Sequence, residues 1–145
     1  MTLKLIEANL GKIVFARFFE DEELLETINL SAKQSGVNAG VFSLIGTLKK
    51  AKVGFYREGK HHTINVEGPL EIVSCTGNIS LKENKPFAHA HICVSDEKGE
   101  VKGGHVMPGC VIGVFGELVL IEAQNAHLHR KLDKKTNLFP LSMEK

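Results

Sequence analysis

PFAHAHICVSDEKGEVKGGHV, the stretch from Pro86 to Val106, contains three of the 7 histidines of this 145-residue chain. Successive side chains of a β-strand point to opposite faces of the sheet. His89 and His91 are therefore predicted to project together from one face. The other face carries only small or apolar side chains, namely Ala88, Ala90, Ile92 and Val94. The pattern predicts a strand with one core face and one histidine face.

His105 follows on the next predicted strand, and its face depends on how the two strands pair. If Ser95 pairs with Glu100, His105 lies opposite Ala90 and points into the core. One extra residue in the loop, or one bulge, would place His105 on the histidine face instead. Glycine accepts backbone angles closed to other residues, so the Gly103–Gly104 pair offers a place for a bulge. Without either irregularity, His105 could act as a ligand only across a subunit boundary.

Three histidines on one face form a ligand set for a metal ion, because neutral imidazole is the commonest metal ligand. Three imidazoles leave a tetrahedral Zn²⁺ with one open position, as in catalytic zinc sites. We therefore predict a zinc site formed by His89, His91 and His105. The alternative is that these are ordinary structural histidines. Cys93 shares the face and is either a fourth ligand or a packed side chain, which is the more usual role of a buried cysteine.

The rest of the chain predicts one helix among many short strands. DEELLETINLSAKQSG (21–36) has apolar residues at helical spacing, with Asp21 as its N-cap and Gly36 as its C-terminal stop. Apolar and alternating runs between Gly, Asn, Asp and Pro predict strands elsewhere. One of them, AGVFSLIGTL (39–48), is predicted to be buried on both faces. We expect a single α+β domain over residues 1–145, with a mainly antiparallel sheet and one packed helix.

Composition and charge argue against several classes of function. The net charge of +1 provides no long-range attraction to nucleic acid or membrane, and the absence of Trp with a single Tyr argues against a base-stacking surface. No apolar run approaches the ~20 residues of a membrane span. The three cysteines are odd in number and lack CxxC spacing, which favours a reducing compartment. With no signal-peptide pattern at the N-terminus, we predict a cytoplasmic protein.

Segments spread over nearly the whole chain resemble the plants-and-prokaryotes conserved (PPC) domain family, in its stand-alone prokaryotic form. They are GVFSLIGTLKKAKVGFY (40–56), GPLEIVSCTGNISL (68–81), FAHAHICVSDEKGEVKGGHV (87–106) and GELVLIEA (116–123). The third is the most specific, because HxH, an acidic-Gly turn and GGH occur in order. The resemblance implies an antiparallel sheet with one helix and assembly as a homotrimer. It also implies a metal, zinc by expectation, held by histidines matching His89, His91 and His105.

In plants, the PPC domain follows an AT-hook in DNA-associated nuclear regulators. An AT-hook needs a Gly-Arg-Pro core to enter the minor groove, and this chain has none. Its basic residues form only local clusters, which solvated surface explains, although a trimer would triplicate each cluster. We therefore predict that DNA binding is weak and non-specific. The residues predicted to carry it are Lys49, Lys50, Lys52, Lys134 and Lys135.

Two functions remain open from the sequence. The first is a metal-binding homotrimer with an assembly or regulatory role, associated weakly with DNA. The second is a zinc enzyme, or a small-molecule-binding protein that uses the open metal site. An enzyme needs a proton-transfer group near the metal. The chain offers only turn carboxylates and more distant ones, namely Asp96, Glu97, Glu100, Glu71 and Glu117.

Two other histidine pairs are expected to have no role in the site. His61 and His62 follow a charged segment and are predicted to be exposed and inert. His127 and His129 share strand parity and form a second HxH pair, but the sequence offers no third ligand nearby.

Overall fold

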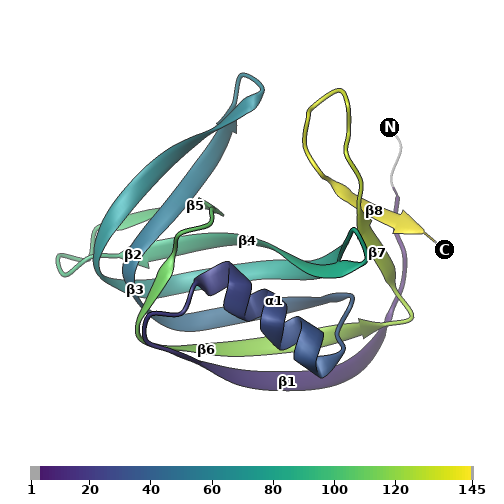
Figure 1. The fold of residues 1–145 in the computed structure, drawn as a ribbon, viewed down its shortest axis with the longest axis horizontal. Helices are drawn as coiled ribbons and strands as arrows, with labels where there is room; N and C mark the ends of the chain where they lie inside the picture. Colours follow the sequence, from purple (N-terminus) through teal and green to yellow (C-terminus); the bar gives the residue numbers. More distant parts are fainter. Residues whose placement is uncertain (1–3, 145) are drawn as a thin grey trace.

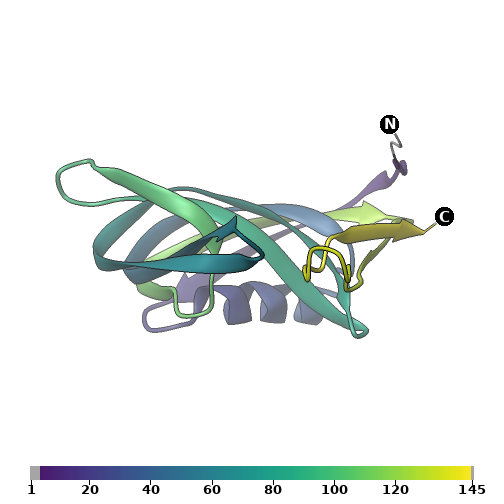
Figure 2. The same ribbon diagram turned by 90° about the horizontal axis from the view of Figure 1, so that it is seen from above.

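The computed structural model describes residues 4–144 and is dominated by one eight-stranded sheet, with a helix lying along one of its faces (Figures 1 and 2). The strands run in the spatial order β1-β6-β2-β5-β4-β3-β7-β8. Their bounds are β1 Asn9–Phe19, β2 Gly40–Arg57, β3 Lys60–Lys82, β4 Lys85–Ser95, β5 Val101–Val106, β6 Val111–Gln124, β7 His127–Arg130 and β8 Leu141–Glu144. Neighbouring strands pair antiparallel, except that β3 and β7 pair in parallel. The predicted mainly antiparallel sheet with one packed helix is confirmed.

The helix α1 spans Leu24–Ser35 and is capped at both ends. Glu23 is the N-cap, and its carboxylate accepts a hydrogen bond from the backbone N–H of Glu26. The predicted N-cap, Asp21, lies outside the helix in a left-handed conformation with φ 70°. Gly36 ends the helix as predicted, because its φ of 69° suits glycine and its N–H caps the last turn.

The hydrophobic core lies between α1 and the sheet face that the helix covers. Ile28 and Ala32 on the helix are fully buried. The predicted core face of β4 is confirmed, with Ala88, Ala90, Ile92 and Val94 all buried. The backbone N–H of Ala88 also donates to Oδ1 of Asn29 on α1, which ties β4 to the helix. The histidine face of β4 is therefore the face that points away from α1.

The opposite face of the sheet carries several exposed apolar side chains in the described chain. Phe42 and Leu44 of β2 are buried, but the alternate residues Val41 and Ile45 are 55% and 54% exposed. Within the single chain, residues 39–48 are therefore buried on one face alone, the face that α1 covers, and not on both faces as predicted. On β1, Ile13 and Phe15 are also exposed, and Ile13 lies across Ile121 of β6 from Val41. We define the outer apolar face as Ile13, Phe15, Val41 and Ile45.

The histidine face is continuous with the outer apolar face. Val41 of β2 pairs with Asn78 of β3, and Asn78 pairs with His89 of β4. Residues directly opposite one another in antiparallel strands share a face.

No helix within residues 4–144 has the length and apolar character needed to cross a membrane.

Candidate metal centre

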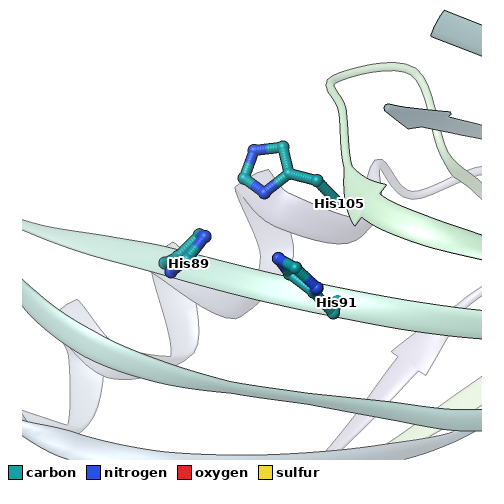
Figure 3. A group of neighbouring side chains, drawn as sticks. All are labelled: His89, His91 and His105. Carbon is teal, nitrogen blue, oxygen red and sulfur yellow. The ribbon is translucent and has the colours of Figure 1, made fainter. Parts of the chain in front are cut away.

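Three histidines from two neighbouring strands converge above the sheet (Figure 3). His89 and His91 project from β4, and His105 projects from β5. Each offers one nitrogen, and these three nitrogens all lie within 4.8 Å of one another. The ring centroids are 5.0 Å apart for His89–His105 and 5.5 Å apart for His91–His105. One ion placed among the three nitrogens could be reached by all of them.

The length of the β4–β5 loop places His105 on the histidine face. His91 pairs with His105, and Ser95 pairs with Val101. Residues 96–100 therefore form the loop, with one residue more than a direct Ser95–Glu100 pairing would leave. Asp96 holds the loop by accepting hydrogen bonds from the backbone N–H groups of Lys98 and Glu100. Of the two predicted irregularities, a longer loop or a bulge, the structure has the longer loop.

The interpretation of Gly103 and Gly104 as a bulge is wrong. Both residues pair in regular register, with Cys93 and Ile92 of β4. A Cβ at Gly103 would collide with the carbonyl oxygen of Ile92, and one at Gly104 would press against the carbonyl oxygen of Gly54. The glycines are therefore explained by close backbone packing around β5, which holds the strand that carries His105.

The surroundings of the cluster favour the neutral form of its imidazoles. His89 and His105 are partly buried, and His91 is exposed. Burial lowers the pKa of His89, and the nearby charge of Arg130 lowers it further. Burial, and secondarily the neighbouring His89, lowers the pKa of His105 to about 4. Neutral imidazole is the form that binds metal, so these two rings are ready to act as ligands at pH 7.

The lowered pKa of His105 predicts that the metal-free protein loses stability on acidification. The unfolded chain binds a proton at His105 near the ordinary value of 6.5, whereas the folded chain binds it near 4. This contribution to stability is therefore present above pH 6.5 and is lost as the pH falls toward 4. In chelator-treated protein, we expect the Tm difference between pH 7 and pH 5 to be smaller for His105→Gln than for the native chain. Equal differences in thermal melts would contradict this.

His61 is a neighbour of the cluster that the sequence did not reveal. Its ring is exposed but stacks on His105, with centroids 5.0 Å apart, and meets Tyr56 edge-on at 5.6 Å. His62 stacks on Phe55, and its Nε2 is buried without a hydrogen-bond partner. The prediction that the His61–His62 pair is inert thus misses these contacts. Only the pairing of β2 with both β3 and β5, which places this hairpin beside His105, could have revealed them.

The other candidate ligands lie outside the cluster. Cys93 is exposed and unpaired and is not part of the three-residue group. Among the side chains that the structure describes, the group contains no carboxylate, and the Asp96 carboxylate is engaged by its own loop. His127 and His129 on β7 are likewise not part of it. The arrangement can bind a metal through three imidazoles, and its described members include no acidic residue that could transfer a proton.

A buried arginine lies on β7, which is separated from β4 by β3. Arg130, at the end of β7, is only 8% exposed. Its Nε donates to the hydroxyl of Ser80 at 3.1 Å, and one terminal nitrogen donates to Oδ1 of Asn78 at 2.6 Å. The other terminal nitrogen donates to the carbonyl of Phe139 at 3.1 Å. The guanidinium therefore joins the C-terminal segment to β3 beside the histidine face.

The lysines predicted to contact DNA lie in two separate regions. Lys49 forms ion pairs of 2.7 Å with Glu20 and Asp21, and the hydrogen bond that it donates to Asp21 is the main cause of its raised pKa. Lys49 also borders a cleft of about 630 Å³ whose lining includes four carboxylates, those of Glu20, Glu71, Asp96 and Glu97. This acidic setting opposes phosphate binding at Lys49. Lys50 and Lys52 follow on β2, whereas Lys134 and Lys135 are exposed between β7 and β8.

Fold and site together define a class: a mainly antiparallel α+β domain that presents three histidines as a candidate metal centre. The model of the Plants and Prokaryotes Conserved (PCC) domain matches residues 5–124 of the chain. The chain belongs to this family. The match includes all three histidines of the cluster and ends before β7.

Solved structures of similar fold include two archaeal proteins. A plant- and prokaryote-conserved (PPC) protein from Pyrococcus horikoshii is 32% identical, with a TM-score of 0.87 and 99% coverage of both chains. A metal-containing protein from Archaeoglobus fulgidus is 29% identical, with a TM-score of 0.85 over 97% of this chain and 99% of its own. A Ralstonia eutropha protein provisionally named as DNA-binding is 23% identical, with a TM-score of 0.79 over 90% of each chain, and this likeness shows the fold alone.

Curated relatives include the bifunctional protein GlmU of two Synechococcus strains. Each is 28% identical to this chain, over 134 and 130 residues. The matches cover 92% and 89% of this chain but only 20% of each GlmU protein. The chain thus spans about one fifth of the length of these relatives.

Proposed function

We propose that this protein is a metal-binding homotrimer with an assembly or regulatory role, and that its metal is zinc. The observation that carries the proposal is the convergence of three imidazole nitrogens within 4.8 Å. An all-imidazole set suits zinc among the available divalent metals and leaves one position open. The metal-containing Archaeoglobus fulgidus protein supports the proposal, since it shares the fold at 29% identity. The test is whether substitution of these histidines removes a metal that the native protein retains.

The outer apolar face supports assembly. Phe15, at 78% exposure, is the most exposed of its four residues, and none of the four is covered by α1. Exposed apolar patches of this kind mark protein–protein contacts, and the resemblance to the PPC family implies closed three-fold assembly. Because the histidine face adjoins this surface, the metal centre would lie beside a subunit boundary. We further propose that residues 1–145 act as one such domain.

An accessory role is favoured over catalysis at this site. The described cluster includes no carboxylate that could transfer a proton to metal-bound water. The GlmU relatives also fit an accessory role, because the matching segment is a fifth of a larger protein. The alternative is a zinc enzyme, which would need another group, such as His61, to serve as the base. A cytoplasmic location is part of the proposal, supported by three unpaired cysteines.

DNA binding, in this proposal, is weak and non-specific and depends on exposed lysines. We expect affinity for a duplex to fall steeply between low and physiological salt, following counterion release, and to be equal for A·T-rich and G·C-rich duplexes. Replacing Lys134 and Lys135 with glutamine should lower affinity and reduce the salt slope by roughly one per lost phosphate contact. Lys49→Gln is the matched control and should change little, because Lys49 is paired with Glu20 and Asp21.

The measurement is a fluorescence titration of both duplexes at two salt concentrations. Binding that persists at physiological salt and prefers one base composition would contradict the proposal. It would mean that the assembled protein presents a recognition surface.

A further inference from the structure

Arg130 is a buried cation without an acidic partner in the described chain. Its three hydrogen bonds go to a hydroxyl, an amide oxygen and a backbone carbonyl, all of them neutral acceptors. Among the described side chains, those of residues 4–142, none of the ion pairs includes Arg130. Burial lowers its pKa. A guanidinium has five N–H donors, so three bonds leave two for another acceptor.

This cation lies beside the candidate metal centre. Asn78, which accepts from Arg130 at 2.6 Å, is the residue of β3 that pairs directly with His89. Paired residues share a face of the sheet, so the guanidinium approaches the same face as the cluster. Its charge is also felt there, because Arg130 contributes to the lowered pKa of both His89 and His105.

A metal in this centre would leave the site strongly positive. Three neutral imidazoles do not offset the charge of a divalent ion, and the cluster includes no carboxylate or thiolate among the described residues. Arg130 adds a further positive charge, and this residue is only 8% exposed. Like charges in a partly buried setting repel more strongly than in water. A bound anion would offset both charges at once.

We propose that the metal and Arg130 together bind the oxyanion group of a small ligand, a carboxylate or a phosphate; this rests on the proposed metal site. One oxygen takes the open position on the metal, and another accepts hydrogen bonds from the guanidinium. Arginine is suited to this task, because its planar fork matches the geometry of carboxylate and phosphate groups. Neutral molecules would bind through the metal alone, because they leave Arg130 without a counter-ion.

Arg130 also has a structural role that the test must separate from ligand binding. Through the carbonyl of Phe139 it holds the C-terminal segment against β3. A variant that removes the arginine could loosen this segment. Asn78→Asp avoids the difficulty, because it keeps the arginine and its hydrogen bond while supplying an internal carboxylate that competes with the ligand.

The experiment uses the full chain loaded with Co²⁺, whose visible absorption changes when its open position is filled. Inorganic phosphate and acetate are the oxyanion probes, and imidazole is a neutral ligand that needs no arginine. Arg130→Gln and Asn78→Asp should each weaken oxyanion binding by roughly 10- to 100-fold, the range expected for charged hydrogen bonds. Imidazole binding should be unchanged. Lys85→Gln, which removes an exposed positive charge from β4, is the matched control and should behave as the native chain.

Each outcome decides the proposal. Oxyanion affinity in Arg130→Gln within about twofold of the native value, against the expected 10- to 100-fold loss, would overturn it. An equal loss of oxyanion and imidazole binding in both variants would show a structural effect and overturn it too. Failure of the native chain to take up Co²⁺ would overturn the metal site itself, which is a separate result. Preference for phosphate over acetate, or the reverse, identifies which class of oxyanion the ligand carries.

Discussion

Protein purified without chelator is expected to contain about one zinc ion per chain, and His89→Ala or His91→Ala to contain almost none. Each histidine supplies one of three converging nitrogens, so two ligands remain after substitution. Losing a direct ligand should weaken binding by more than the roughly 10- to 100-fold typical of losing an outer-shell partner. Elemental analysis by mass spectrometry measures the metal content directly and identifies the ion.

His127→Ala is the matched control for this experiment. His127 is a histidine of β7 that is exposed and does not belong to the cluster, so its loss should leave the metal content unchanged. Full metal content in the double variant His89→Ala/His91→Ala would rule out this centre. A different metal at the same stoichiometry would keep the centre and reject zinc.

Ile45→Glu is expected to convert a trimer into monomers. Ile45 is 54% exposed on the outer apolar face and pairs with Glu117 of β6. In an assembled protein, the new carboxylate would be buried beside an existing one in each subunit. Leaving an unpaired charge in a buried interface typically costs several kcal/mol. Light scattering should report about three times the chain mass of 15.9 kDa for the native protein and the single-chain mass for the variant.

Leu30→Glu provides the control for assembly. Leu30 is 50% exposed, but it lies on α1, which covers the other side of the sheet. It should therefore retain the native mass. A native protein that is monomeric at micromolar concentration, or an Ile45→Glu variant that stays trimeric, would contradict the proposed interface.

Alternation along single strands was predictable from the sequence. The parity of residues 88–94 separates the core face of β4 from the histidine face, and burial of Ala88 and Val94 confirms it. The helix was predictable for a similar reason, since Ile28 and Ala32 recur at helical spacing and are buried. Where the spacing of apolar residues along one strand or helix determines which face is buried, the sequence is sufficient to predict that face.

Features that depend on pairing between distant segments were not predictable. The face of His105 depended on the length of the β4–β5 loop, because a loop of four residues and a loop of five residues turn His105 to opposite faces. The stacking of His61 on His105 depends on where the β2–β3 hairpin lies. Arg130 is 50 residues from Ser80 in the chain, so no local pattern predicts the hydrogen bond between them. Burial on both faces was predicted for the apolar run 39–48, because an exposed apolar face and a buried one have the same residue composition.

The five-residue β4–β5 loop also constrains how this chain can diverge. Successive residues of β5 face opposite ways, so the parity that turns His105 outward turns Val106 inward, where it is 2% exposed. Inserting or deleting one loop residue would reverse both side chains and exchange a core valine for an imidazole. A related protein can therefore lose metal binding through substitution of a histidine and still keep the fold. A one-residue change in loop length cannot have the same result, because it would also disrupt the core and the variant would be lost to selection for a folded protein.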